Sequence, residues 1–209
     1  MDGSPPFFLH SVRHWLWLVS PLSPQPARGR RRFMDPLTCT RDEFDEMLEK
    51  LSRRGLGWRT CRKTDPFGRA LAWLEGSSTL HRGLPRGHAE QLLVSYFITY
   101  SECYCQPQLY FAPERPMSPR EMSTWLCEVC YGVVERQDYE APVVSMAFSE
   151  ELQMAVWGLH PCDTTQLMRN TLANGAGDDN LLELFLRGVG RLVGVDERLL
   201  PSCTGNPRE

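Results

Sequence analysis

Several features are scarce or absent in this chain of 209 residues, and two of the absences exclude whole classes of protein. No run of 18 or more uncharged apolar residues occurs, which argues against a membrane-spanning helix. No internal repeat is visible, so the regular period of a solenoid or propeller is missing. Lysine is scarce, since only two of the 23 Lys and Arg residues are lysines, Lys50 and Lys63. A coding bias toward arginine is the simplest explanation. The composition, 42% hydrophobic and 23% charged, is that of a globular protein.

No convincing secretory signal opens the chain, which bears on its eight cysteines. A signal needs a basic start and an uninterrupted apolar centre, whereas here an aspartate is the second residue and an arginine interrupts the apolar segment. The cysteines are therefore expected to be reduced thiols of a cytoplasmic protein. Cys103 and Cys105, together with Cys127 and Cys130, supply enough thiols for zinc. The second pair falls inside a predicted helix without a glycine-rich knuckle, so neither a metal nor a cofactor is predicted.

Charge is unevenly distributed along the chain. Residues 1–33 carry five arginines and one aspartate, a net charge of +4, and the remainder carries −7. This acidic body argues against nucleic acid as the main partner. The segment 1–33 is predicted to be a disordered N-terminal extension, and a basic patch for membranes or acidic partners is the weaker alternative. Residues 34–200 are predicted to form one folded domain, followed by a C-terminal tail at 201–209.

Hydrophobic periodicity and turn residues predict an α+β fold, with an antiparallel sheet flanked by helices. A capping box and an amphipathic stripe predict the first helix, and a second capping box at Ser118 predicts another. Residues 76–87 are rich in glycine and polar side chains and are predicted to form a loop. The predicted elements are, in order, a helix at 40–51, strands at 58–63, 69–74, 91–100 and 103–111, a helix at 119–133, strands at 143–148 and 154–157, a helix ending at 174–175, and a helix at 181–193.

One short stretch, residues 152–168, concentrates the chemistry of the chain. An apolar strand runs into His160 and Pro161. Proline has no N–H to donate to a β-ladder, and it disfavours helical dihedrals at the residue before it. Cys162 is predicted to lie in the loop between this strand and a helix capped by one of the next three residues. Backbone amides and the helix dipole favour a thiolate at such a position. A buried, inert cysteine in a tight connection is the structural alternative.

The sequence His160-Pro161-Cys162, after a hydrophobic strand and before a helix, resembles the active-site segment of the ubiquitin-like conjugating enzymes of autophagy. Residues 96–111 are similar to the same family, because a strand ends in tyrosine-serine and the next runs through a proline into leucine-tyrosine-phenylalanine. In order of elements the resemblance covers about residues 36–195, and it implies the ubiquitin-conjugating-enzyme-like fold. One branch of the family, that of autophagy-related protein ten, joins a modifier to a protein lysine. It is favoured over the lipid-conjugating branch, whose long acidic insertion ahead of the cysteine is not visible here.

The resemblance also implies partners and roles. Cys162 is expected to receive the C-terminal glycine of the ubiquitin-like autophagy modifier twelve, as a thioester, from the activating enzyme autophagy-related protein seven. It then passes the modifier to a lysine of autophagy-related protein five, without nucleic acid or stable membrane insertion. The asparagine that serves the oxyanion in ordinary ubiquitin carriers is missing, so Tyr104 and Ser145 are expected to stabilise the oxyanion or position the lysine. Tyr100 is the second tyrosine considered, ordinary strand packing is the alternative for both tyrosines, and His160 belongs to the motif.

Two other functions stay open from the residues alone. A non-catalytic module of the same fold would bind a ubiquitin-like protein or an autophagy factor on its sheet, and it would have no use for an exposed thiolate at Cys162. A Cys–His hydrolase would need a base from elsewhere in the fold, and only His81 and His88 are available, both in the predicted loop. A hydrolase is therefore the less well supported of the two.

Overall fold

The computed structural model describes residues 35–83, 89–130, 144–173 and 180–201. The predicted extension at 1–33, and all of the predicted tail except the buried Pro201, lie outside these residues. The elements are α1 (Arg41–Ser52), β1 (Arg59–Thr64), β2 (Ala70–Gly83), β3 (Ala89–Ser101), β4 (Gln106–Pro113), α2 (Pro119–Val129), β5 (Val144–Ser149), β6 (Met154–Leu159), α3 (Pro161–Ala173), α4 (Leu181–Val189) and two short 3₁₀ helices (Gly190–Val193 and Glu197–Leu199). Among the described residues, no helix has both the length and the apolar character needed to cross a membrane.

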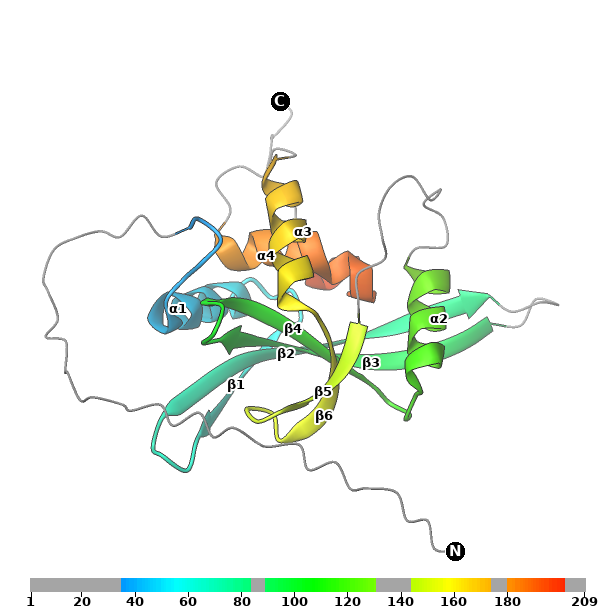
Figure 1. The fold of residues 1–209 in the computed structure, drawn as a ribbon, viewed down its shortest axis with the longest axis horizontal. Coiled ribbons are helices and arrows are strands. Elements are labelled where there is room, and N and C mark those ends of the chain that lie inside the picture. Colours follow the sequence, from blue (N-terminus) through cyan, green and yellow to red (C-terminus); the bar gives the residue numbers. More distant parts are fainter. Residues whose placement is uncertain (1–34, 84–88, 131–143, 174–179, 202–209) are drawn as a thin grey trace, which may run out of the picture. The chain divides into compact units, whose positions relative to one another are not determined.

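The strands form one six-stranded antiparallel sheet, in the order β1-β2-β3-β4-β6-β5 (Figure 1). Helix α1 packs against β1 and β2, α2 contacts β2 and β5, and α4 contacts β4 while α3 packs on α4. The predicted α+β class, an antiparallel sheet flanked by helices, is confirmed. Strands that follow one another in the chain are neighbours in the sheet, with one exception. β5 is not next to β4, because β6 lies between them. The second half of the chain therefore adds a hairpin to the β4 edge, and this hairpin leads into α3.

The two predicted capping boxes are both present, because they depend only on local chemistry. The Thr40 hydroxyl accepts from the Glu43 backbone N–H, and the Glu43 carboxylate accepts from the Thr40 backbone N–H at 2.7 Å. Ser118 and Glu121 repeat the arrangement at α2, where proline occupies the first helical position. In α1 the predicted apolar stripe is buried, and its members are Phe44, Met47, Leu48 and Leu51.

The prediction of a loop at residues 76–87 is wrong for most of that segment, where β2 and β3 continue as an antiparallel ladder. Packing explains why small and polar residues occupy a strand here. The ring of Trp58 lies so close to Gly76 that a β-carbon would approach it to 2.9 Å. The buried hydroxyl of Ser78 accepts a hydrogen bond from the Asp196 backbone N–H at 2.9 Å. Both residues are fitted to distant parts of the fold, which local propensity does not reveal.

The predicted strand at 103–111 begins later than expected, because residues 102–105 form the turn between β3 and β4. Cys105 takes a φ of +51°, an uncommon conformation for a residue with a side chain, and this closes the turn before Gln106. Tyr104 therefore lies in a turn and not on a strand. Pro107 follows at the start of β4, where β6 has not yet joined the ladder, since their pairing begins at Tyr110. A proline is tolerated at such a locally unpaired edge.

The C-terminal helices differ from prediction in one respect. The predicted helix at 181–193 is α-helical only as far as Val189, and a 3₁₀ turn follows, ending at Gly194 with a φ of +78°. This turn lets the chain fold back on Leu80, whose side chain comes within 2.5 Å of where a β-carbon on Gly194 would stand. Predicted helical residues 131–133 and the predicted helix end at 174–175 lie outside the described residues.

Candidate active site

Cys162 is exposed and lies in the first turn of α3. This helix follows β6 in the chain (Figure 1). The helix begins at Pro161, so the prediction of a loop cysteine with the helix capped at 163–165 is wrong. The physical reason is that proline has no N–H to leave unpaired at the first helical position and its φ is already helical. The thiol consequently belongs to a regular element, and its direction is set by helical geometry. Its exposure also removes the alternative of a buried, inert cysteine.

His160 performs the capping that was assigned to the later residues. Its Nδ1 accepts the Cys162 backbone N–H at 3.2 Å, and its carbonyl accepts the Thr164 backbone N–H at 3.1 Å. The Thr164 hydroxyl also donates to this carbonyl, at 3.4 Å. An acceptor at Nδ1 requires that nitrogen to be unprotonated. In this arrangement the ring interacts with the backbone of the cysteine, which gives His160 a structural role in holding the start of α3.

Gln106 joins the first turn of α3 to the sheet, and nothing in the sequence pointed to it. Its side chain is buried, with 3% exposed. Its amide Nε2 donates to the Pro161 carbonyl at 3.5 Å, and its Oε1 accepts from the Thr165 hydroxyl at 3.1 Å. The signal available in the sequence was a polar residue directly before a proline at a strand start. That signal alone does not tell whether the polar residue is exposed in a turn or buried against another element.

The two residues expected to serve the oxyanion lie on two different elements, the β3–β4 turn and β5. Tyr104 is in the β3–β4 turn, two residues before Gln106, and its side chain is 45% exposed. Ser145 is exposed on β5 and pairs with Gly158, which precedes Cys162 by four residues. Both side chains are accessible to a docked partner. Their expected roles remain predictions.

Tyr100, the second tyrosine considered, is part of the core. It is 8% exposed, and its hydroxyl donates to the Cys39 carbonyl at 2.7 Å. Its ring packs on Phe44 with 5.4 Å between ring centroids. Burial raises the pKa of its phenol above the ordinary value. Tyr100 is therefore a core packing residue, which is the alternative considered for it.

The cysteines differ sharply in environment. All seven in the described residues are free thiols. Burial raises the pKa of Cys39 to about 12 and that of Cys130 to about 11, so these two are neutral thiols at pH 7. Cys162 is exposed, as are Cys103 and Cys127. Within the described part of the chain, no group of three or more His, Cys, Asp or Glu side chains is arranged to hold a metal ion.

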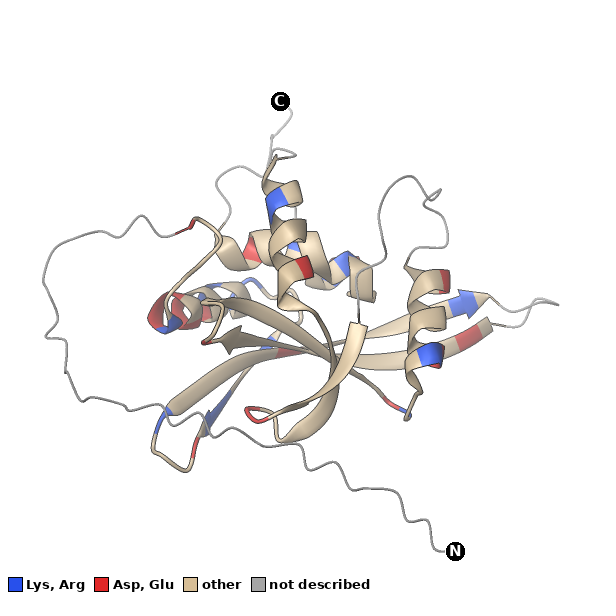
Figure 2. Cartoon of the chain, viewed as in Figure 1, with Lys and Arg blue, Asp and Glu red and all other residues tan. Residues whose placement is uncertain are grey.

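The strands that present Cys162 carry no charge, since β5 and β6 contain neither acidic nor basic residues (Figure 2). The β5 strand is the last in the sheet order, and Met146 and Phe148 on it are 57% and 63% exposed. Acidic residues gather instead on α1 (Figure 2). The two strands before the cysteine are thus uncharged, whereas Asp163, the residue after it, is acidic.

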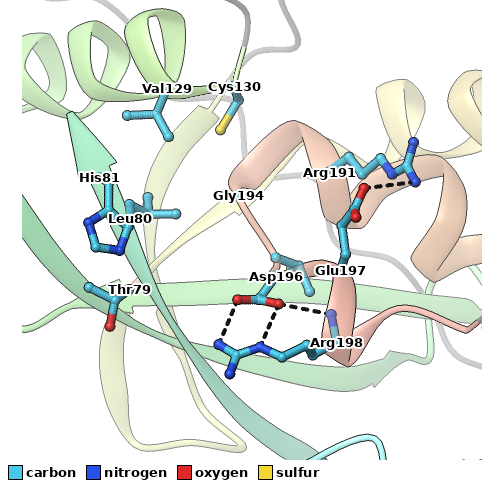
Figure 3. A pocket seen from close by; sticks show the side chains of 11 residues that line it. Thr79, Leu80, His81, Val129, Cys130, Arg191, Gly194, Asp196, Glu197 and Arg198 are labelled. Carbon is cyan, nitrogen blue, oxygen red and sulfur yellow. Dashed lines mark hydrogen bonds and ion pairs between the residues drawn. The ribbon is translucent and has the colours of Figure 1, made fainter. Parts of the chain in front are cut away.

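A hollow of about 580 Å³ lies elsewhere, between the end of α2 and the chain after α4 (Figure 3). Ion pairs occupy its rim, where Arg198 bonds Asp196 at 2.8 Å and Arg191 bonds Glu197 at 3.3 Å. Its lining does not include Cys162. A second hollow, beside α1, is not lined by Cys162 either.

Comparison with known families supplies one match. The family model described as "autophagocytosis associated protein, active-site domain" matches residues 41–199, which is most of the chain. The matched segment runs from the start of α1 to the second 3₁₀ helix and contains Cys162, His160 and Gln106. A search of curated proteins finds no match.

Proposed function

Because this chain belongs to the family of autophagocytosis-associated proteins, through an active-site domain of the E2-like conjugating type, we propose that it carries a ubiquitin-like modifier as a thioester on Cys162. The observation that carries the proposal is the exposed thiol in the first turn of α3, inside the matched segment. Such a carrier needs an accessible thiolate, a donor for the oxyanion and a docked amine, but no metal or triad.

The proposed modifier is ubiquitin-like autophagy modifier twelve, the donor is autophagy-related protein seven, and the acceptor is a lysine of autophagy-related protein five. These assignments follow the protein-conjugating branch of the family. The interval between α2 and β5, residues 130–143, supports this branch because it is short, whereas the lipid-conjugating branch carries a long acidic insertion ahead of the cysteine. The proposed compartment is the cytoplasm.

In the first step of the proposed reaction, the Cys162 thiolate attacks the thioester carbonyl that joins the modifier to the activating enzyme. The carbon–sulfur bond to the activating enzyme breaks, its cysteine leaves as a thiolate, and a new thioester forms on Cys162. The chemistry requires the attacking sulfur to reach a carbonyl held by a second protein. An exposed position in the first turn of α3 meets this requirement.

In the second step, the neutral lysine amine attacks the new thioester. A tetrahedral oxyanion forms, then collapses to an isopeptide bond, with the Cys162 thiolate as the leaving group and one amine proton released to solvent. Tyr104 and Ser145 are the proposed hydrogen-bond donors or lysine-positioning groups, because both are exposed, one two residues before Gln106 and the other paired with Gly158 on β6. A donor to a developing oxyanion contributes a factor of roughly 100 or more in rate.

A single-turnover chase tests the proposed function and its branch together. The protein is charged with modifier twelve by activating enzyme seven, ATP is removed, and either protein five or vesicles containing phosphatidylethanolamine are added. Transfer of the modifier to protein five, with none to the lipid, is expected. The chase is repeated with the protein charged with the modifier that the lipid-conjugating branch uses. Transfer of that modifier to phosphatidylethanolamine would overturn the branch assignment. Tyr104→Phe and Ser145→Ala, both of which preserve the backbone, are expected to slow the chase without reducing charging.

A further inference from the structure

A buried amide from β4 lies against the first turn of the helix that bears the reactive cysteine. We propose that Gln106 is a positioning residue that fixes this turn, and with it the direction of the Cys162 thiol. The proposed role in transfer rests on the proposed function, whereas the role in holding the turn does not. Gln106 is at the start of β4, 55 residues before Pro161 in the chain, so the link is tertiary.

The contact is made by both ends of the amide. The Nε2 donates to the Pro161 carbonyl, and the Oε1 accepts from the Thr165 hydroxyl. The same hydroxyl lies 3.0 Å from the Pro161 carbonyl, and a hydroxyl has one proton to donate. When the Thr165 proton goes to Gln106, the amide N–H of Gln106 serves the carbonyl in its place. Without Gln106 the Thr165 hydroxyl keeps the Pro161 carbonyl as an acceptor, but the link from this turn to β4 is lost.

Burial makes this arrangement costly to break. Gln106 is 3% exposed, so an unpaired amide there would not be compensated by bulk water. The apolar anchoring of α3 is modest, since the described buried residues of the helix are Thr164 and Met168. Met168 lies beyond the first turn, so Thr164 is the buried residue described within it, and its side chain is polar. Polar contacts also hold the turn, since the His160 Nδ1 accepts the Cys162 N–H and the Gln106 amide donates to the Pro161 carbonyl.

A fixed first turn matters for acyl transfer because the sulfur must meet a carbonyl at near-attack distance. Misplacement by about 1 Å can cost on the order of 100-fold in rate. Gln106 makes its contacts within the chain and does not need to touch a partner. Its loss should therefore slow transfer from charged enzyme, by roughly 10-fold, while the acceptor concentration for half-maximal rate stays unchanged.

The test compares Gln106→Met, which keeps the length of the side chain but removes both hydrogen bonds, with Gln108→Met as the matched control. Gln108 is on the same strand, and its side chain has no hydrogen bond to α3 in the described residues. Two measurements are made on each purified full-length variant. Hydrogen exchange of peptides covering residues 162–168 reports the first turn directly, and single-turnover transfer reports the reaction.

Gln106→Met is expected to speed exchange at Thr164 and Thr165 by roughly 10-fold and to slow transfer, while Gln108→Met matches the wild-type protein. Thr165→Val should give the same pattern, and the double variant should be no worse than the poorer single variant, because both act on one contact. If Gln106→Met does not fold, Thr165→Val carries the same two measurements.

Unchanged exchange at residues 164 and 165 in a folded Gln106→Met protein would overturn the proposal, whatever the transfer rate. Faster exchange throughout the protein, with transfer unchanged after charging, would also overturn it, because Gln106 would then support the fold alone. If the wild-type protein accepts no modifier, the proposed function fails but the exchange measurement still decides the role of Gln106.

Discussion

At the scale of single residues, the neighbours of Cys162 act on its backbone. His160 is two residues away in sequence, and its Nδ1 is bonded to the cysteine N–H at 3.2 Å. A ring held in this way caps a helix whose first backbone N–H groups lack intrahelical partners. Its role in this structure is therefore to fix the start of α3. It does not need to act as the base for the thiol.

Replacement of His160 distinguishes capping from acid–base chemistry. His160→Ala is expected to lower the free energy of unfolding by about 1 kcal/mol, because one backbone N–H loses its acceptor. His160→Asn keeps a side-chain acceptor at the cap position and should recover most of the loss. Urea unfolding of both variants measures the difference. Equal stability of the two variants would show that the Nδ1 contact contributes little.

Cys162 could be chosen from the sequence as the candidate reactive cysteine, but its environment could not be predicted. Three adjacent residues and the strand before them were enough to identify Cys162. The burial of Tyr100 depends on Cys39, a partner 61 residues away that its hydroxyl contacts. Gln106 likewise became visible only through Pro161 and Thr165. Side-chain partners so far apart in the chain leave no local pattern that a single sequence reveals.

At the scale of elements, the hairpin that leads to the active site is joined to the sheet by close packing at one point. β6 pairs with β4 through two residue pairs, Tyr110 with Gly158 and Phe111 with Trp157. The Tyr110 ring stands against Gly158, where a β-carbon would come within 2.8 Å of it. Glycine is required there by space, since its φ is not in the left-handed region.

Gly158→Ala is therefore expected to destabilise the protein by about 1–3 kcal/mol, because the Tyr110 ring must move. Gly83→Ala is the matched control, as a β-carbon at this strand glycine meets nothing within 4 Å among the described residues. The control should stay within about 0.5 kcal/mol of the wild-type protein. Thermal or urea unfolding gives both values, and equal losses would contradict the packing argument.

Elements with local causes were predicted well, and those with tertiary causes were not. Both capping boxes placed a helix start correctly, because a side chain and a backbone N–H three residues apart decide them. The extension of β2 to Gly83 was missed, because its polar residues are paired and buried by distant parts of the chain. The start of α3 was placed too late, because the cap is a histidine and not one of the usual residues.

At the scale of the whole molecule, Arg41 and Glu151 join α1 to the turn between β5 and β6. The guanidinium donates to the Glu151 carboxylate at 3.4 Å and to the Ala72 carbonyl at 3.1 Å. Burial raises the pKa of Glu151, and the attraction of Arg41 offsets this in part. A carboxyl with a raised folded-state pKa contributes stability that is present below its unfolded pKa and is lost as the pH rises through the folded value.

Glu151→Gln should consequently have little effect on the free energy of unfolding below about pH 4, where the carboxyl is protonated in both states. As the pH rises from the unfolded pKa through the raised folded pKa, the variant should become more stable than the wild-type protein, because it no longer carries a buried charge. Glu150→Gln removes the same charge from an exposed neighbouring position and separates burial from net charge. A Glu151→Gln protein that is less stable at pH 7 would mean that the ion pair with Arg41 outweighs burial.

The central claim is that Cys162 carries the modifier, and thioester trapping tests it most directly. The protein is incubated with autophagy-related protein seven, ATP and modifier twelve, and gels are run with and without reducing agent. The account predicts a shifted band that reducing agent removes, that resists it in Cys162→Ser as an oxyester, and that persists unchanged in Cys127→Ser, an exposed thiol on α2. No band with a competent activating enzyme, or a band that survives in Cys162→Ala, would contradict it.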